Sequence, residues 1–215
     1  VHLGRKNVLK VDLHDFFPSI RSPRVRAAFR EMGYSRSIAK VLAELCCLRC
    51  CLPQGAPTSP ALSNIIAYPM DKKMMALAGE YGLVYTRYAD DLTFSGDYLP
   101  KDEVLVRIHR IIREEGFTMN VKKTRFLSEH KRKIITGVSV SSGKKMTLPK
   151  VKKREIRKNV HYVLTKGLVG HQEHIGSTDP VYLKRLLGSL CYWHSIEPDN
   201  RYVSCLLYTS DAADE

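Results

Sequence analysis

The stretch Gly82–Gly96, GLVYTRYADDLTFSG, is the most informative part of the sequence. It is rich in Val, Tyr, Thr and Phe, which favour β-strands, and it predicts two short strands joined as a hairpin. The adjacent carboxylates Asp90 and Asp91 stand at its middle. Because neighbouring like charges repel, a hairpin that keeps both carboxylates ionised is expected to hold a cation there. The alternative is that both residues are turn formers.

Length and charge limit the class of protein. The 215 residues suffice for one large domain, or for one domain and a smaller lobe. The chain has 35 Lys and Arg against 22 Asp and Glu, a net charge of +13, which points to a polyanion such as nucleic acid or an acidic membrane. No apolar run approaches the roughly 18–20 residues that span a bilayer, and no signal peptide opens the chain. We therefore expect a soluble cytoplasmic protein with no membrane partner.

The C-terminal residues differ in character from the rest. The segment 205–215, CLLYTSDAADE, does not continue the basic composition before it and resembles the reading-frame translation of a common sequencing adapter. We expect residues 205–215 not to be native and the natural sequence to be interrupted after Ser204. The chain also begins with Val1 rather than Met, so a true start is expected to be missing.

The expected elements of the first part of the chain alternate between strands and helices. Residues 7–13 predict a strand, and Ser22 with Pro23 predicts the start of a helix that Gly33 ends. The next helix has apolar residues at helical spacing, namely Ile38, Val41, Leu42 and Leu45. A loop over 52–60 leads into a helix that Ser59 is expected to cap, and Pro69 predicts a kink or break within it.

After the hairpin, a helix is expected between Pro100 and Gly116, followed by three strands, FTMN, TRFLS and KIITGVSVS. Ser142-Gly143 predicts a hairpin turn. From Pro149 the composition becomes basic, and a lobe boundary is expected near 147. A last helix is expected to follow a cap at Asp179. This order indicates an α+β domain followed by helices.

Four of the six cysteines lie in LCCLRCCLPQG, namely Cys46, Cys47, Cys50 and Cys51. A structural zinc site usually needs two separated pairs, and only an H-x-x-H at His171 and His174 is available as a second pair. We favour small, buried, reduced thiols at a helix end, with zinc as the alternative.

Three carboxylates suggest a chemistry. Asp12 closes a strand of apolar residues, and Asp90 and Asp91 occupy the hairpin. A carboxylate from one strand and a pair from a neighbouring hairpin can hold two divalent cations about 3.5–4 Å apart, which catalyse in-line phosphoryl transfer. Mg²⁺ suits this set because it prefers a few carboxylates with phosphate oxygens and water, and Mn²⁺ is the alternative.

Three segments in order, VDLHDFFPSI (11–20), LPQGAPTSPALSN (52–64) and YADD (88–91), resemble the reverse transcriptase family, and the bacterial retron-type enzymes most closely. The resemblance extends from about His2 to Trp193. It implies an α+β right-hand polymerase palm, with an antiparallel sheet and helices on one face, over residues 1–147. It also implies a partial, basic, mostly helical thumb over 148–204, with the fingers largely missing because almost nothing precedes the first motif.

The resemblance also implies residue roles. The metal-binding aspartates are matched by Asp12, Asp90 and Asp91. Phe17 matches the bulky residue under the incoming sugar, where an aromatic ring excludes a 2′-OH, and a core aromatic is the alternative. The loop against the incoming nucleotide is matched by Gln54 and Gly55. Tyr88 and Ala89 complete the box near the primer end, where the small Ala89 leaves room for a base or sugar.

Outside the palm motifs the implied roles are less specific. Lys123 matches a lysine near the pyrophosphate, which acts as general acid or neutralises leaving-group charge, with Lys122 or a solvated lysine as alternatives. The triplet Ile135-Thr136-Gly137 stands where retron enzymes carry Val-Thr-Gly, a region linked to recognition of their own RNA. On the helix that begins near 150, four basic residues are expected to meet phosphates of a template–primer duplex, with a solvated face as the alternative: Lys152, Lys153, Arg157 and Lys158.

The implied function is that of a retron-type RNA-directed DNA polymerase. It extends a DNA or RNA primer with dNTPs on an RNA template, using two Mg²⁺ ions. A cognate non-coding RNA, an RNA-linked DNA product, an antiphage role and an effector protein are expected by resemblance alone. The alternatives are a group II intron-type or other bacterial reverse transcriptase, or an inert RNA-binding palm. Because the finger Lys and Arg that clamp the triphosphate are absent, we expect this fragment alone to be weak or inactive.

Overall fold

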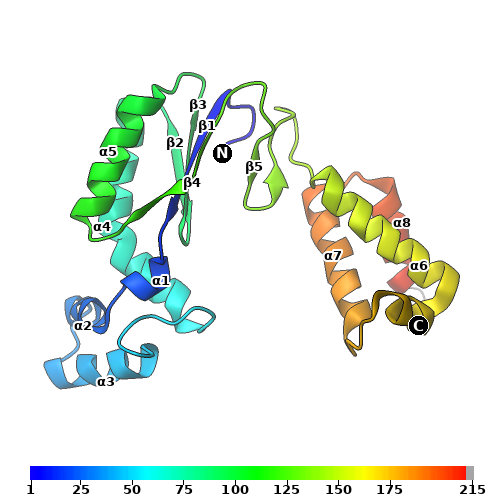
Figure 1. The fold of residues 1–215 in the computed structure, drawn as a ribbon, viewed down its shortest axis with the longest axis horizontal. Coiled ribbons are helices and arrows are strands. Elements are labelled where there is room, and N and C mark those ends of the chain that lie inside the picture. The colour runs from blue at the N-terminus through cyan, green and yellow to red at the C-terminus, as the bar shows by residue number, and fades with distance from the viewer. Residues whose placement is uncertain (212–215) are drawn as a thin grey trace. The chain divides into compact units, whose positions relative to one another are not determined.

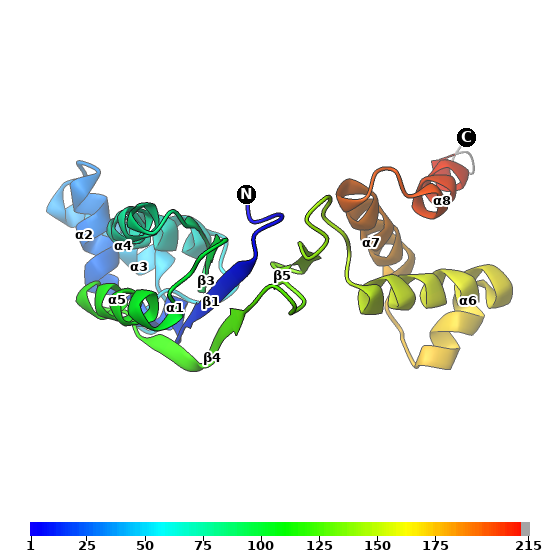
Figure 2. The same cartoon turned by 90° about the horizontal axis from the view of Figure 1, so that it is seen from above.

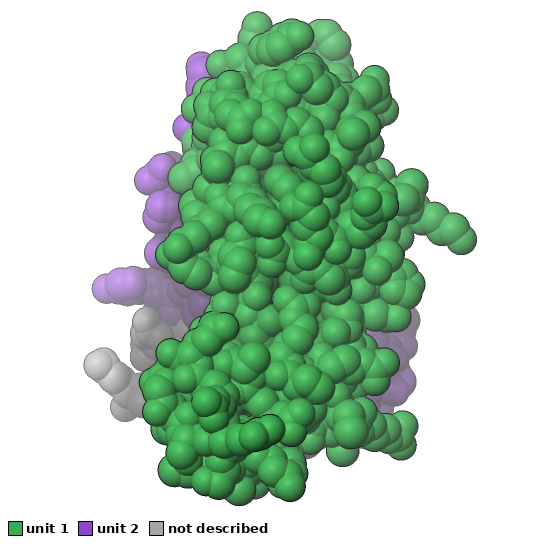
Figure 3. All heavy atoms as spheres, turned by 90° about the vertical axis from the view of Figure 1, so that its left-hand side faces the viewer, with its two compact units in different colours: residues 1–131 green, residues 132–215 purple. Residues whose placement is uncertain are grey.

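The computed structural model describes residues 1–211, with side chains described through Tyr208. Two compact units divide the chain, residues 1–131 and the residues from 132 onward (Figure 3). None of the helices within the described residues is long and apolar enough to cross a membrane.

The first unit is built on a four-stranded sheet in the order β2-β3-β1-β4, with every neighbouring pair antiparallel. The strands are β1 (Asn7–Leu13), β2 (Val84–Tyr88), β3 (Asp91–Gly96) and β4 (Met119–Leu127). The expected hairpin is β2–β3, and β3 also pairs with β1 so that Asp12 lies opposite Asp91. The register therefore brings carboxylates that are far apart in the sequence onto adjacent strands.

Helices α4 (Thr58–Glu80) and α5 (Lys101–Glu114) cover one face of this sheet (Figures 1 and 2). Their apolar residues recur at helical spacing, which places one stripe of each helix against the strands. The core joins Met70, Met74 and Leu77 of α4 to Ile108 and Ile112 of α5, all essentially fully buried. Burying such a side chain contributes roughly 1.5–3 kcal/mol. The prediction of an α+β fold with an antiparallel sheet and helices on one face is confirmed.

The cap expected at Ser59 and a break at Pro69 are both absent from α4. The helix begins at Thr58 after Pro57, and the Ser59 hydroxyl donates to the Pro53 carbonyl at 2.6 Å instead of capping the helix. The helix also continues through Pro69 without a break. Proline removes one main-chain hydrogen bond. Buried residues on both sides of it, Ala67 and Met70, hold the helix against the sheet.

Three helices precede α4: α1 (Phe16–Ser19), α2 (Ser22–Glu31) and α3 (Arg36–Cys46). Ser22 is the first residue of α2 and not its cap, while the Ser35 hydroxyl does cap α3 by accepting from the Ile38 amide at 3.3 Å. Of the four apolar side chains expected to pack from α3, Leu42 is half-buried and the other three are largely exposed: Ile38 by 50%, Val41 by 54% and Leu45 by 78%. The small residues Ala39 and Ala43 are buried instead, because alanine lets two helices approach closely.

The strands expected at FTMN and TRFLS are one strand, β4, with an irregular middle. Lys10 of β1 pairs with Arg125, whereas Asp12 pairs with Asn120, so residues 121–124 bulge out of the ladder. A bulge re-aims the side chains that it carries. Here it redirects the segment that contains Lys123.

In the second unit, KIITGVSVS is not the single strand expected. It folds as a hairpin of β5 (Ile134–Ile135) and β6 (Val138–Ser139), because Thr136 and Gly137 both adopt positive φ, 45° and 84°. The expected turn at Ser142-Gly143 then returns the chain, so that Ser139 and Thr147 exchange main-chain hydrogen bonds of 2.8 and 3.0 Å. The expected lobe boundary near 147 separates strands from helices, whereas the compact units divide between 131 and 132. This hairpin therefore belongs to the second unit.

The remaining helices are α6 (Lys150–Ile175), α7 (Tyr182–Ile196) and α8 (Arg201–Asp211). They enclose a core around the fully buried Trp193, with Ile156 and Val160 from α6. α6 is interrupted at Gly167, whose φ of 75° is not helical. Asp179 accepts from the Val181 amide at 3.0 Å just before α7. Of the segment expected not to be native, residues 205–211 continue α8, and 212–215 lie outside the described residues.

Candidate active site

A cavity of about 480 Å³ in the first unit gathers side chains from four separate segments of the chain. Five of the residues singled out from the sequence line it, namely Asp12, Phe17, Gln54, Asp90 and Lys123. They come from β1, α1, the loop before α4, the β2–β3 turn and β4. Other lining residues include His14, Asp15 and Asn120. The fold therefore brings residues 12–17 together with side chains that lie far from them in the sequence.

Asp12 lines the cavity, and its two carboxylate oxygens have different surroundings. Its Oδ2 lies 3.3 Å from the Lys123 ammonium, and its Oδ1 is buried with no hydrogen-bond partner in the described structure. A buried carboxylate oxygen without a partner is costly. A bound cation would supply the partner that this carboxylate oxygen lacks.

Asp91 is held differently. Its Oδ2 forms an ion pair of 2.8 Å with Lys10, and both side chains are mostly buried, 27% and 24% exposed. Lys10 and Asp12 lie two residues apart on β1 and so share a face of the sheet. Lys10 was missed in the sequence, although this i, i+2 spacing was visible there.

The turn that carries Asp90 is fixed by its backbone and by a buried ion pair. The Leu13 amide donates to the Asp90 carbonyl at 2.9 Å, and Ala89 has a positive φ of 50°. The Arg87 guanidinium donates to the Ala89 carbonyl at 3.1 Å and forms a bidentate pair with Asp71 of α4 at 2.6 and 2.8 Å. No local pattern predicts this pair, because its partners are 16 residues apart on different elements.

Tyr85 completes the same cluster. Its hydroxyl donates to Asp71 Oδ1 at 2.7 Å, and burial, together with the Asp71 charge, raises the pKa of this phenol. The hydroxyl therefore stays protonated and remains a donor. Asp71 is thus bonded by two residues of β2, which ties α4 to the strand that leads into the Asp90 turn.

The residues matched to nucleotide binding lie around the cavity to different extents. Phe17 is half-buried against the Phe16 ring, with ring centroids 5.3 Å apart, and Gln54 lines the cavity beside it. Gly55 has a φ of 87°, which a side chain disfavours, so its backbone stays open to a ligand. Ala89 and the 72%-exposed Tyr88 lie in and before the turn but do not line this cavity.

The donor atoms fit a hard divalent cation in part. Asp12 and Asp90 line one cavity and offer carboxylate oxygens, the ligands that Mg²⁺ prefers. Asp91 is occupied by Lys10, and within residues 1–211 no group of three or more His, Cys, Asp or Glu is arranged as a metal site. The zinc site considered as an alternative at Cys46, Cys47, Cys50 and Cys51 is likewise not found among the described residues, and these cysteines are free thiols. Cys50 is exposed and the other three are only partly buried, unlike the buried thiols expected.

In the second unit, the four basic residues of α6 have different surroundings. Lys153 forms an ion pair of 2.6 Å with Glu197, and Arg157 lies over the rings of Trp193 and Tyr202, at 5.3 and 5.2 Å. Lys152 contacts Glu155 at 3.0 Å and stays exposed, as does Lys158. Ile135 is buried, whereas Thr136 and Gly137 form the exposed tip of the β5–β6 hairpin.

Comparison with known proteins agrees with these features. A family model for reverse transcriptases (RNA-dependent DNA polymerases) matches residues 2–163. The retron Ec86 reverse transcriptase of Escherichia coli is 39% identical over 176 residues, covering 81% of this chain and 54% of that protein. The retron Mx65 reverse transcriptase of Myxococcus xanthus is 36% identical over 218 residues, covering 92% and 48%. The resemblance to retron-type reverse transcriptases is confirmed.

This chain spans about half the length of the two curated relatives just described. Among solved structures, an apo telomerase from Candida tropicalis, truncated from its C-terminal domain, is 13% identical with a TM-score of 0.47. The match covers 64% of this chain and 34% of the telomerase chain. This similarity is too low to bear on fold or function.

Proposed function

Because this chain belongs to the reverse transcriptase family, we propose that it forms the palm and part of the thumb of a retron-type RNA-directed DNA polymerase. The full enzyme extends a DNA or RNA primer with dNTPs on an RNA template. The observation that carries the proposal is the cavity into which four separate segments bring Asp12, Asp90, Phe17, Gln54 and Lys123. An inert binding module has no need to bring carboxylates from separate segments, Asp12 and Asp90, into one cavity.

The carboxylates hold the metal in this proposal. Two Mg²⁺ ions, or Mn²⁺ in their place, would when bound supply activation of the primer hydroxyl and stabilisation of the leaving oxygen in phosphoryl transfer. Asp12 and Asp90 offer oxygens to the cavity, and Asp91 joins them by exchanging the Lys10 ammonium for a cation. The unpartnered Asp12 Oδ1 supports this assignment because it lacks the hydrogen bond that a buried oxygen requires.

Lys123 serves the leaving group. Its side chain is 64% exposed, and its ammonium reaches Asp12 Oδ2 from the bulge of β4. A lysine that borders the cavity neutralises charge on the departing pyrophosphate or gives it a proton. Lys122 lies in the same bulge but does not line the cavity, which favours Lys123 of the two.

The remaining assignments concern substrates. Phe17 selects deoxynucleotides by excluding a 2′-OH. Gln54 and Gly55 lie against the nucleotide, and Ala89 and Tyr88 face the primer end. On α6, Lys152 and Lys158 remain exposed for phosphate contacts, whereas Lys153 and Arg157 are engaged with Glu197 and the Trp193 ring. The hairpin tip at Thr136-Gly137 contributes to recognition of a cognate RNA, together with Ile135.

The cellular role follows from the relatives rather than from the site. We infer that the enzyme acts in the bacterial cytoplasm on its own non-coding RNA, makes RNA-linked DNA, and serves an antiphage system with an effector protein. The curated relatives are named retron reverse transcriptases of bacteria, which supports this reading. A group II intron-type enzyme would share the cavity but leave its DNA product free of RNA.

A primer-extension assay tests the proposal. A full-length enzyme that contains this sequence is incubated with an RNA template, a primer, dNTPs and Mg²⁺. We expect DNA synthesis that EDTA abolishes, and a product that RNase shortens if RNA and DNA are linked. Absence of synthesis, together with tight salt-dependent RNA binding, would contradict the polymerase and favour a binding module.

A further inference from the structure

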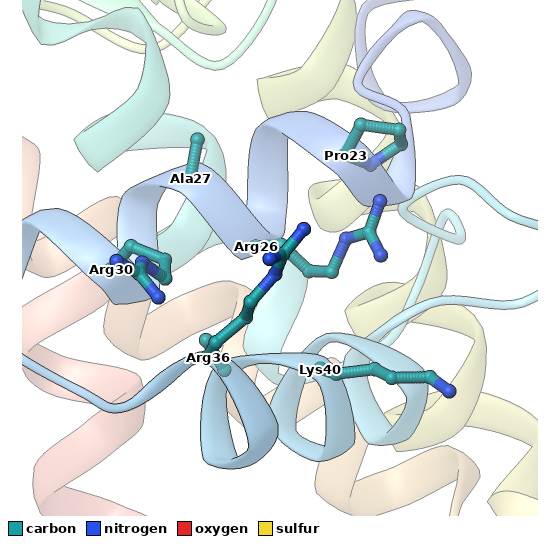
Figure 4. Close-up of a pocket in the computed structure, with 7 residues that line it drawn as sticks. Pro23, Arg26, Ala27, Arg30, Arg36 and Lys40 are labelled. Atoms are coloured by element: carbon teal, nitrogen blue, oxygen red, sulfur yellow. The ribbon is translucent and has the colours of Figure 1, made fainter.

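A second basic feature of the first unit lies between α2 and α3, away from the catalytic cavity. Four cationic side chains line a groove of about 460 Å³, Arg26 and Arg30 from α2 with Arg36 and Lys40 from α3. Figure 4 shows that they come from both helices, with Arg36 reaching from α3 toward α2. We call this feature the α2–α3 groove. A volume of this size is ample for a bound ligand group.

The cations of the groove are almost unpaired. Among residues 1–211, no carboxylate forms an ion pair with any of its three arginines, and Lys40 has only Glu44 at 3.9 Å. The two cations of each helix are four residues apart, an arrangement that destabilises a helix by about 0.2–0.5 kcal/mol per like-charged pair. The neighbouring Arg24 is not part of the set, because its guanidinium lies over the Phe117 ring at 4.6 Å. The fold therefore concentrates positive charge here without internal compensation.

The other side chains that line the groove are small. Ala27 and Ala39 line it between the cations, and Ala39 is buried against α2. Alanine at this contact keeps the helices close and leaves the long basic side chains free to turn inward from both sides. No aromatic or large aliphatic side chain lines the groove. Protein partners usually dock through such anchors.

We propose that the α2–α3 groove binds phosphate groups of an RNA strand. Three of its four cations are arginines, whose planar fork matches phosphate oxygens in a bidentate manner. An acidic protein segment would also complement the positive charge, but the groove offers no large apolar side chain on which such a segment could pack. The observations therefore favour a nucleic acid as the ligand. The identity of the polyanion rests on the proposed function, since a reverse transcriptase already handles RNA. The anionic character of the ligand rests on the groove alone.

The groove is separate from the chemistry. The two sets of lining residues have no member in common, so the groove adds a contact to the RNA without touching the reacting atoms. The groove therefore raises the affinity for RNA and positions the RNA strand on the protein. It does not act on the rate of nucleotide addition once RNA is bound.

The test is salt-dependent binding of a labelled single-stranded RNA to the 215-residue chain. The variant R26Q/R30Q/R36Q/K40Q removes the four charges. A matched control, K72Q/K101Q/R110Q/R113Q, removes four charges from exposed positions of α4 and α5. Each lost phosphate contact on a single strand lowers the magnitude of the negative slope of log K against log salt by about 0.7. For three to four contacts this magnitude falls by about 2–3, and the Kd at about 150 mM salt rises roughly 50- to 200-fold.

The outcomes separate the possibilities. The control variant is expected to keep the wild-type slope, and both variants to keep the wild-type Tm, because all eight residues are exposed. Equal RNA binding by the groove variant and the control would overturn the proposal. So would a groove variant that binds RNA normally but no longer binds poly-glutamate, because that result assigns the groove to an acidic protein.

Failure of the proposed function would look different. In the full-length enzyme, the groove variant is expected to keep the maximal extension rate and to require more RNA to reach it. If the polymerase proposal is wrong, the wild type itself makes no DNA, yet the loss of RNA affinity in the groove variant is still measurable.

Discussion

The buried pair between Arg87 and Asp71 allows a quantitative prediction. The Arg87 side chain is 5% exposed and Asp71 is 18% exposed, with contacts of 2.6 and 2.8 Å. The substitution Asp71→Asn keeps the shape but leaves a buried guanidinium without its counter-charge. Breaking a buried pair in this way costs about 3–5 kcal/mol, and the partial exposure of Asp71 places this case near the lower limit, at about 3 kcal/mol.

Urea unfolding followed by far-UV circular dichroism measures this cost. With an m-value of roughly 1–3 kcal/mol/M, a loss of 3 kcal/mol lowers the midpoint by about 1–3 M. The substitution Glu44→Gln is the matched control, because its pair with Lys40 is 3.9 Å long and both side chains are about two-thirds exposed. It is expected to cost less than about 1 kcal/mol. Trp193, the only tryptophan, lies in the other core and reports that core separately by fluorescence.

A double-mutant cycle decides whether the pair is the cause. The variants Asp71→Leu and Arg87→Met are expected to lose less together than the sum of their single losses, with a coupling of at least about 2 kcal/mol. Arg87 also bonds the Ala89 carbonyl in the turn before Asp90, so Asp71→Asn should slow primer extension by about 10-fold at temperatures where the enzyme stays folded. Additive losses, or a cost of Asp71→Asn below about 1 kcal/mol, would refute the reasoning.

Four further predictions follow from single contacts. Burial, the N-terminal ammonium and Arg5 lower the pKa of His2 to about 4. Up to about 3 kcal/mol of stability is therefore present above pH 6.5 and is lost as the pH falls toward 4. The substitution His2→Gln should flatten this pH dependence of stability in urea titrations. Burial opposes ionisation of Glu197, but hydrogen bonds led by Lys153 lower its pKa to about 2. Stability of the helical core should therefore persist down to about pH 4.5 and fall toward pH 2, and Glu197→Gln should cost about 2 kcal/mol by Trp193 fluorescence. Phe17→Ala should raise ribonucleotide incorporation at least ~10-fold in primer extension, and an unchanged dNTP preference would count against its assigned role. Lys10→Gln should change the Mg²⁺ concentration needed for half-maximal extension, and an unchanged metal requirement would show that Lys10 does not compete for Asp91.

The elements that the sequence predicted correctly have local signals. The β2–β3 hairpin follows from its Val, Tyr, Thr and Phe content, and α5 follows from apolar residues at helical spacing. The three motifs placed Asp12, Phe17, Gln54 and Asp90 near one another by resemblance, and the cavity agrees with that placement. A specific motif thus locates a site even when it says nothing about the contacts inside it.

The features that were missed depend on packing between distant elements. The face of α3 that packs is set by close approach of Ala39 to α2, which outweighs the more apolar stripe around Ile38. The bulge of β4 depends on pairing with β1, and Thr136-Gly137 forms a tight turn in what reads as a continuous strand. Contacts such as that of Lys10 with Asp91 need the register of two strands, which no local pattern supplies.

The most direct test of the central claim is primer extension with Asp91 replaced. In a full-length enzyme that contains this sequence, Asp91→Asn is compared with Asp97→Asn, an exposed aspartate just beyond the other end of β3. We predict that Asp91→Asn abolishes DNA synthesis on an RNA template while RNA binding persists, and that Asp97→Asn leaves synthesis intact. Unchanged synthesis by the Asp91→Asn enzyme would contradict the assignment of the carboxylates on β1 and in the β2–β3 hairpin to catalysis.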